Sequence, residues 1–231
     1  MLPDNLDSTS IVEFQARVMS WGADNYQEFP WRNGQTAYEI LIAETLLHRT
    51  RARQAEPVYR KFLQRYPDLD TLSQAAEEDI RNLLWPLGLH WRVEKLLDLV
   101  REIVEVHQGE IPRDRSCLMS LPGVSGYIAS AIRCFFWGEQ DALLDTNTVR
   151  IAGRVFGLKT TDSSRRGKRF MSLLTSLVPE RDPGAYNYAL LDLAHLKCAP
   201  KSPDCVNCPL RDYPCEFGVL SSNDQDISKI I

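Results

Sequence analysis

Apolar residues recur every three or four positions along almost the whole chain, as in helices that bury one face. Alternation of apolar and polar residues over more than four positions, the pattern of a half-buried strand, is absent. Proline and glycine, as at Pro86 and Gly88, separate the helical stretches. The sequence therefore predicts an all-α fold, with helices around residues 11–21, 36–50, 58–63, 93–104, 116–121, 127–136, 149–156, 170–177 and 186–193.

Composition and charge exclude several classes of protein. Of the 231 residues, 44% are hydrophobic and 25% are charged, which excludes wholesale disorder. No apolar run approaches the ~18 residues of a membrane span, and the first residues lack the pattern of a secretory signal. We therefore expect a cytoplasmic protein. The net charge of −4 argues weakly against a nucleic-acid partner, but acidic residues gather at both ends and residues 49–65 are strongly basic.

Four of the six cysteines fall within 18 residues near the C-terminal end. They are Cys198, Cys205, Cys208 and Cys215. In a reducing compartment such a group indicates a metal site before it indicates disulfides. The irregular spacing favours an iron–sulfur cluster, while a single zinc ion and two disulfides are the alternatives.

Residues 121–127 read Leu-Pro-Gly-Val-Ser-Gly-Tyr between two predicted helices. A tight turn at the start of a helix leaves backbone N–H groups unpaired, and these groups bind phosphate well. The alternative is a plain connection between two helices.

Two carboxylates are candidates for catalysis. Asp145 opens an amphipathic helix, where it could act as a simple N-cap or, in a cleft, stabilise a cationic transition state. Glu44 and His48 are four residues apart on the predicted helix 36–50 and would share one stripe, with a solvated helix surface as the alternative. Arg49, Thr50 and Arg51 follow directly, either as a DNA-backbone contact or as a solvated charge run.

Taken together, these segments resemble the helix-hairpin-helix DNA glycosylases that carry an iron–sulfur cluster. This superfamily includes endonuclease III, the MutY-type adenine glycosylases and the MIG-type thymine-DNA mismatch glycosylases. The matching stretches are 37–50, 86–92, 121–127, 144–150 and the cysteine group, in the same order and at similar spacing. The resemblance extends from about Phe29 to Cys215, which is most of the chain.

The resemblance implies an endonuclease III-like fold of two helical domains with the active cleft between them. We expect a helical-barrel domain at 29–139 that ends in the hairpin, and a cluster domain made of 1–28 with 140–218. Residues 219–231 would form a flexible tail. Tyr127 and Asp145 would face each other across the cleft, and the cysteines would hold a 4Fe–4S cluster that braces the C-terminal loop.

The resemblance also assigns roles to single residues. Asp145 matches the catalytic aspartate, and Glu44 matches the pocket glutamate of the MutY and MIG groups. Tyr127 stands where bifunctional members carry a lysine that attacks the sugar. Because a phenol forms no Schiff base, the chain should be monofunctional, with water as the nucleophile. The amides of Gly123, Val124, Ser125 and Gly126 would grip the DNA backbone, and His48, Arg49, Leu89 and His90 would fill the gap left by a flipped nucleotide.

The expected substrate is thymine or uracil opposite guanine in double-stranded DNA. His48-Arg49 and Leu89-His90 look closer to the MIG type, and only 16 residues follow Cys215, too few for the C-terminal domain of MutY enzymes. The alternatives are an adenine glycosylase acting opposite guanine or 8-oxoguanine, and a non-catalytic protein that binds DNA structures. We expect a monomer in a prokaryotic cytoplasm, associated with the nucleoid.

The chain departs from the family pattern at two places. The hairpin has Ser125-Gly126 where the family usually has glycine directly after the valine, so Ser125 would be strained if that position needs a positive φ. The last two cysteines are separated by six residues where five are usual, which a one-residue bulge could absorb.

Overall fold

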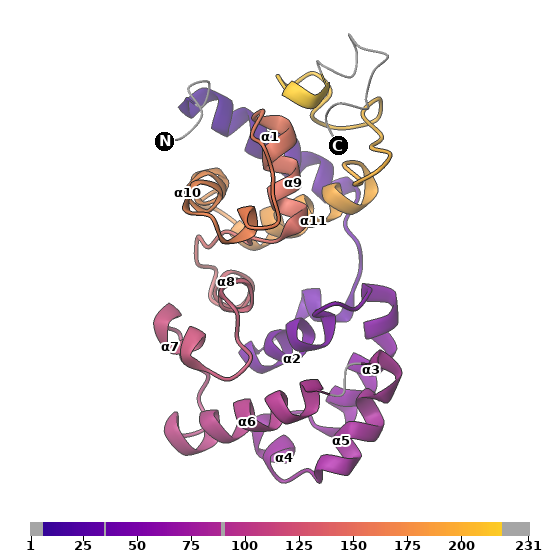
Figure 1. The fold of residues 1–231 in the computed structure, drawn as a ribbon, viewed down its shortest axis with the longest axis vertical. Helices are drawn as coiled ribbons and strands as arrows, with labels where there is room; N and C mark the ends of the chain where they lie inside the picture. The colour runs from indigo at the N-terminus through magenta and orange to yellow at the C-terminus, as the bar shows by residue number, and fades with distance from the viewer. Residues whose placement is uncertain (1–6, 35, 89–90, 219–231) are drawn as a thin grey trace. The chain divides into compact units, whose positions relative to one another are not determined.

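The computed structural model describes residues 7–34, 36–88 and 91–218. Throughout these ranges the regular structure is helical, without a β-strand, which confirms the all-α prediction (Figure 1). No helix within them has the length and apolar character needed to cross a membrane. Leu89 and His90, which we predicted to contact DNA, lie outside the described residues.

The chain divides into two compact units, Glu28–Glu139 and Met1–Gln27 with Gln140–Ile231. The helices of the first unit, called here the hairpin unit, are η1 (Pro30–Asn33), α2 (Ala37–Leu47), α3 (Ala52–Arg65), α4 (Leu69–Ser73), α5 (Glu77–Leu84), η2 (Trp85–Leu87), α6 (Trp91–Val106), α7 (Arg115–Ser120) and α8 (Gly126–Phe135). Those of the second, called the cysteine unit, are α1 (Ser8–Asp24), α9 (Thr146–Val155), η3 (Ser164–Arg166), α10 (Lys168–Leu177) and α11 (Pro183–Leu196).

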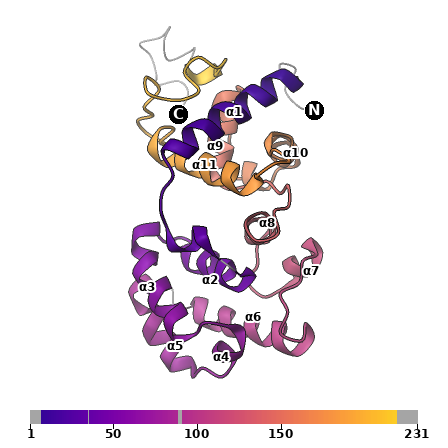
Figure 2. The same ribbon diagram turned by 180° about the vertical axis from the view of Figure 1, so that it is seen from behind.

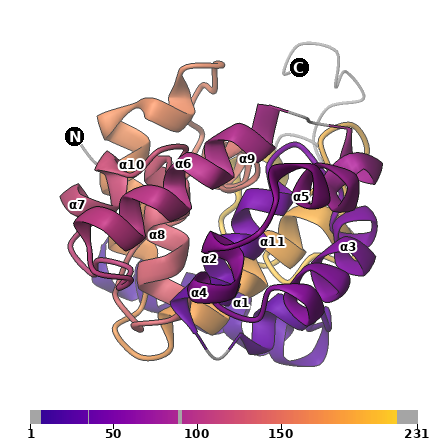
Figure 3. The ribbon, with the colours of Figure 1, turned by 90° about the horizontal axis from the view of Figure 1, so that it is seen from below.

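Helix α2 is the centre of the hairpin unit. It packs against α3 on one side and α8 on the other, as Figure 3 shows. Eight of its residues are buried, because its sequence is apolar nearly all round. Thr36 starts the helix with a capping box, in which Thr36 accepts from the Glu39 amide while the Glu39 carboxylate accepts from the Thr36 amide. These neighbours hold α2, and with it Glu44 and the turn that follows Leu47, in a fixed place within the hairpin unit.

The cysteine unit has its own apolar core. Helix α1 packs along α11, and α9 packs against both α11 and α10 (Figure 2). Gly22 allows α1 to approach α11 closely, because a Cβ at this position would lie 2.3 Å from the Cβ of Ala189 in α11. The chain thus brings its N-terminal helix together with α9–α11, which follow more than a hundred residues later.

The ends of several helices follow from glycine and proline, as the sequence predicts. Helix α5 stops before Pro86, and Gly88 follows with φ +71°, a conformation that glycine adopts without strain. The predicted helix 36–50 is wrong at its C-terminal end, because α2 ends at Leu47 and His48 is its C-cap. The reason lies in the turn that follows, described below.

Candidate functional site

Asp145 is the N-cap of α9, so the capping interpretation of this residue is correct. Its Oδ1 accepts from the backbone amides of Asn147 and Thr148, at 2.8 Å each, and its Oδ2 accepts from Asn147 Nδ2 at 2.7 Å. The Thr148 hydroxyl accepts in return from the Asp145 amide at 3.1 Å. Three donors thus fix the carboxylate at the positive end of a helix dipole, which suits a negative charge.

A continuous chain of hydrogen bonds joins Asp145 to residues 198–215, which contain the four grouped cysteines and are called here the cysteine segment. Arg150 Nη1 donates to Asn147 Oδ1 at 3.1 Å, and Asn147 itself donates to Asp145. Arg150 Nε donates to the Cys198 carbonyl at 2.9 Å, and Nη2 donates to the Ala194 carbonyl at 3.0 Å. Burial lowers the pKa of Arg150. One face of α9 therefore connects the candidate catalytic carboxylate with the first cysteine.

The four grouped cysteines line one small cavity in the cysteine unit, and none of them forms a disulfide. Arg154, one turn beyond Arg150, donates to the carbonyls of Ala199 and Pro200 at 2.8 Å each and approaches Cys198 Sγ at 3.3 Å. Its guanidinium also lies 4.6 Å from the centre of the Phe217 ring. Two arginines of α9 thus hold the start of the cysteine segment, and Arg154 reaches its end.

The cysteine thiols are partly buried, and burial is the main cause of their raised pKa values. The pKa of Cys208 rises to about 11, and the pKa values of Cys205 and Cys215 rise as well. Within the described residues, no three potential ligands converge on a point where one metal ion could be held. The donors are therefore distributed around a cavity rather than around a single point.

The hairpin turn adopts a left-handed backbone conformation at Gly123. Gly123 has φ +79°, which glycine supplies without strain. Ser125 has φ −84° and accepts from the Ile128 amide at 3.2 Å, so it is the N-cap of α8. Strain at Ser125 is therefore not found, because the left-handed position lies two residues earlier.

Residues 47–50 form a tight turn directly after α2, at the start of the basic stretch 49–65. The Thr50 amide donates to the Leu47 carbonyl at 3.0 Å, and the two residues between them are His48 (φ −58°, ψ 109°) and Arg49 (φ +59°). These angles describe a type II turn, whose third residue is usually glycine. A non-glycine residue there costs about 1 kcal/mol or more. The turn ends the helix early and exposes both His48 and Arg49.

Glu44 is buried, with 7% of its surface exposed. The alternative of a solvated helix surface is therefore wrong. His48, one turn further along, is the C-cap of α2 and is exposed, so the two residues differ in burial. A carboxylate is rarely buried without a partner or a role, because burial removes its hydration.

Arg92 holds the turn after α2 in place. This arginine of α6 is only 2% exposed, and its Nη1 and Nη2 donate at 2.9 Å to the Leu46 carbonyl and the Thr50 hydroxyl. Its Nε has no hydrogen-bond partner. Desolvation lowers the pKa of Arg92 to about 10. The buried guanidinium therefore connects α6 with both sides of the strained turn.

We expect Arg92→Met to lower the free energy of unfolding by about 2 kcal/mol, because the Leu46 carbonyl loses its buried donor. Urea unfolding measures this change, and hydrogen exchange of the Thr50 amide reports opening of the turn. Thr50→Val is the matched control, since it removes only one of the two bonds. Equal or higher stability of Arg92→Met would show that desolvation of the charge outweighs both bonds.

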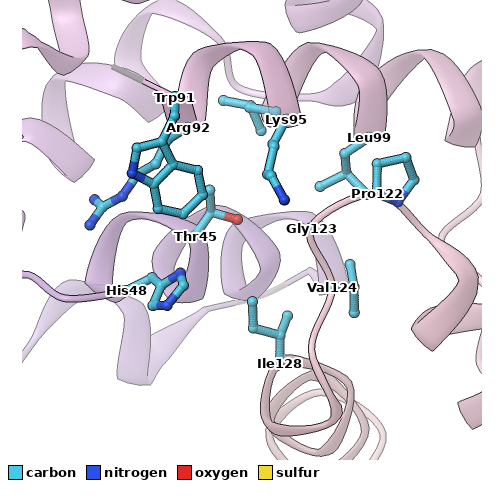
Figure 4. A pocket seen from close by; sticks show the side chains of 11 residues that line it. Thr45, His48, Trp91, Arg92, Lys95, Leu99, Pro122, Gly123, Val124 and Ile128 are labelled. Carbon is cyan, nitrogen blue, oxygen red and sulfur yellow. The ribbon is translucent and has the colours of Figure 1, made fainter. Parts of the chain in front are cut away.

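A pocket of about 110 Å³ opens beside this turn, entirely within the hairpin unit (Figure 4). It lies between the end of α2, the first three turns of α6, the hairpin turn and the start of α8. Its upper part in the view contains Trp91 and Lys95, and His48 closes one side. The residues that line it are Thr45, His48, Trp91, Arg92, Lys95, Leu96, Leu99, Pro122, Gly123, Val124 and Ile128.

The predicted site residues are divided between the two units. Glu44, the turn at 48–51, the hairpin and the half-buried Tyr127 belong to the hairpin unit, whereas Asp145 and the four cysteines belong to the cysteine unit. Their predicted roles, and the facing of Tyr127 and Asp145, stay predictions. Sequence reasoning missed Trp91, Arg92 and Lys95 in the pocket, and Arg150 and Arg154 at the cysteines. The sequence signal that could have pointed to them is the four-residue spacing of Trp91 and Lys95 and of Arg150 and Arg154, because residues four apart lie on one face of a helix.

Comparison with known proteins identifies the family of the chain. The family model described as "HhH-GPD superfamily base excision DNA repair protein" matches residues 42–177. A thymine/uracil-DNA glycosylase of Pyrobaculum aerophilum is 37% identical over 227 residues, covering 94% of this chain and 95% of that protein. An adenine DNA glycosylase of Buchnera aphidicola is 30% identical over 203 residues, covering 87% of this chain and 58% of that protein.

A solved structure of a thermostable thymine-DNA glycosylase superposes with a TM-score of 0.85 at 29% identity, covering 93% of this chain and 100% of that one. The family match covers more than half of the chain and includes the second half of α2, the hairpin and α9. The chain therefore belongs to the HhH-GPD superfamily of base excision DNA repair proteins.

Proposed function

We propose that this protein is a monofunctional DNA glycosylase that removes thymine or uracil opposite guanine. The observation that carries the proposal is the Asp145 carboxylate, fixed by three hydrogen bonds at the start of α9. Similarity over nearly the whole chain to a thymine/uracil-DNA glycosylase supports the choice of base. We further propose a monomer that acts on mismatched duplex DNA in the cytoplasm of a prokaryote.

Breaking an N-glycosidic bond develops positive charge on the sugar as the base departs with the bonding electrons. A carboxylate held in place stabilises that charge without reorganising at the moment of reaction. We assign this role to Asp145, together with orientation of the water that adds to C1′. Tyr127 has no nucleophilic amine, so the reaction ends in an abasic site and the strand stays intact.

The target base must leave the duplex before its glycosidic bond is accessible. We assign the exposed His48-Arg49 turn, held by Arg92, to the space that the flipped nucleotide vacates. The amides of Gly123, Ser125 and Gly126 would bind the phosphate backbone beside it. The Val124 amide, which the sequence also assigned to this role, instead donates to the Leu121 carbonyl at 3.1 Å. Glu44 would hydrogen-bond the extruded pyrimidine or organise water, because a buried carboxylate is a strong acceptor in a dry pocket.

A panel of mismatched duplexes tests the proposed substrate. Purified protein is incubated with T:G, U:G, A:G, A:8-oxoguanine and T:A duplexes, and alkali then cleaves the strand at each abasic site. We expect cleavage of the pyrimidine strand in T:G and U:G, with T:A untouched. Cleavage confined to adenine strands would replace the proposal with an adenine glycosylase, which the similarity to the Buchnera enzyme makes the second candidate. Binding without release of any base would indicate a non-catalytic DNA-binding protein.

We also propose that Cys198, Cys205, Cys208 and Cys215 hold a 4Fe–4S cluster. Four free thiols around one cavity suit a cluster of four irons, which needs ligands spaced around it, better than zinc, which needs ligands converging on one ion. When bound, the cluster would supply a rigid cross-link to the cysteine segment. The hydrogen bonds of Arg150 and Arg154 would orient its first ligand.

Metal analysis and visible absorption test the cluster. Protein purified without oxygen should contain about four irons per chain and absorb broadly in the visible range. Cys208→Ala should lose both signals, whereas Cys117→Ala, which changes an exposed cysteine outside the group, should keep them. One zinc per chain, or protein without metal that still excises bases, would contradict this assignment.

A further inference from the structure

An enzyme that removes thymine opposite guanine must identify the guanine, because thymine is also a normal base opposite adenine. The described part of the hairpin unit contains a pocket beside His48 whose lining includes neither Glu44 nor Tyr127. We propose that this pocket binds the guanine left unpaired when its partner flips out, with the ring on Trp91 and Lys95 Nζ donating to guanine O6 and N7. This inference rests on the proposed function.

Trp91 supplies the flat surface that a base requires. It is 39% exposed in the first turn of α6, although its indole ring is large and apolar. The His48 ring stands almost perpendicular to it, with the ring centres 5.7 Å apart and an angle of 88°. Such an edge-to-face pair fixes the orientation of the indole, and Lys95 Nζ lies over the ring at 5.7 Å from its centre, so a base would stack on the opposite face of the ring. Stacking on aromatic side chains is a common way to bind an unpaired base.

Lys95 supplies the polar contact. It lies one turn after Trp91 on the same face of α6, with Nζ 5.7 Å from the centre of the indole ring. No carboxylate among the described residues forms an ion pair with Lys95. Guanine presents two adjacent acceptors, O6 and N7, and lysine is one of its two usual partners in proteins.

The remaining walls favour a base over a phosphate. Four of the side chains that line the pocket, those of Leu96, Leu99, Val124 and Ile128, are apolar and buried, and they suit the ring of a base better than a charged phosphate. The Thr45 hydroxyl already donates to the Leu41 carbonyl at 2.8 Å, so it offers a ligand only its acceptor side. Burial and neighbouring cations lower the pKa of His48, which disfavours a positive charge on this ring. An apolar floor, one aromatic face and one cation match a purine with acceptors on one edge.

The hairpin turn lies directly against Lys95. A Cβ on Gly123 would lie 3.6 Å from Lys95 Cβ and 3.8 Å from Lys95 Cδ. The stem of the lysine is therefore packed along the turn that is proposed to bind the backbone, and its amine extends toward the pocket in Figure 4. The phosphate grip and the base pocket are thus adjacent, as reading one nucleotide beside a bound backbone requires.

Guanine analogues test the pocket directly. Uracil is placed opposite guanine, 7-deazaguanine, which lacks the N7 acceptor, or hypoxanthine, which keeps O6 and N7 but lacks the 2-amino group. All three form wobble pairs with uracil. Single-turnover excision by the wild type should be about tenfold slower opposite 7-deazaguanine and nearly unchanged opposite hypoxanthine, the effect of one specific base contact. For Lys95→Met, the rates opposite guanine and 7-deazaguanine should be equal.

Two further variants separate stacking from charge. Trp91→Leu should weaken binding opposite every purine about tenfold, and Trp91→Phe should recover most of the loss, because it keeps a ring. Lys159→Met removes an exposed lysine of the cysteine unit and serves as the matched control. The proposal is overturned if Lys95→Met slows every duplex alike, as a phosphate contact would, or if Trp91→Leu changes nothing.

Binding measurements keep this test independent of catalysis. The same three purines are placed opposite tetrahydrofuran, an uncleavable abasic-site analogue, and dissociation constants are measured for each variant. If the wild type excises no base but prefers guanine over 7-deazaguanine in binding, the proposed function fails and the pocket assignment stands. If it excises uracil with no preference among the three purines, the pocket assignment fails and the proposed function stands.

Discussion

Asp145→Asn is expected to slow base release about a hundredfold to a thousandfold while duplex binding survives. Asparagine removes the charge that stabilises the cationic sugar but keeps the shape of the side chain. Its carbonyl oxygen can still accept from the amides of Asn147 and Thr148, so α9 keeps its cap. Single-turnover kinetics on U:G duplexes and a separate binding titration measure the two effects.

The hydrogen-bond network of Asp145 predicts a modest cost in stability for the same variant. Asn147 Nδ2 now donates to Asp145 Oδ2, and an amide nitrogen at that position would face another donor. The loss of this bond should lower the free energy of unfolding by about 1 kcal/mol. Asp145→Ala is the companion variant, since it loses the cap as well and should cost about 1 kcal/mol more. Full activity of Asp145→Asn would contradict the proposed catalytic role.

Tyr127→Lys is expected to add strand cleavage to the release of the base. The lysine amine would attack C1′ and displace the base, and the resulting imine would permit elimination of the 3′ phosphate. Position 127 lies in the first turn of α8, where the positive end of the helix dipole favours the neutral, nucleophilic amine. Borohydride reduction should therefore trap a covalent protein–DNA adduct that the wild type does not form.

Tyr127→Met is the control, because it fills a similar volume without an amine. It should release base or lose activity, but it should form no adduct under borohydride. If Tyr127→Lys released base at an unchanged rate without any trapped adduct, position 127 would not face the sugar. The experiment therefore also tests the predicted facing of Tyr127 and Asp145 across the cleft.

The helical class and many helix boundaries were predictable, because they depend on interactions between residues a few positions apart. A period of three to four residues specifies a buried helix face, and Pro86 and Gly88 stop a helix wherever it lies. The hairpin was predictable for the same reason, since its helices begin and end at local signals. The end of α2 was not, because Arg49 adopts a conformation that its own sequence disfavours.

The burial of Glu44 shows what local patterns leave open. A glutamate near an apolar stripe is compatible with a solvated edge or with a buried position, and the choice depends on what packs against that side of the helix. Helix α2 packs against α3, which begins eight residues after Glu44, and against α8, which begins more than eighty residues after it. The sequence pattern of α2 carries no information on those partners.

The sequence alone determined the helical class, the order of the motifs and the residues that match the family, because these depend on local spacing. Only the tertiary structure decided that Trp91 and Lys95 share a pocket with His48 and Gly123. It also decided that Arg92 supports the turn after α2 and that Arg150 joins Asp145 to the cysteine segment. The physical reason is that such contacts form between segments far apart in the chain, and their strength comes from burial and geometry that only the packed core creates.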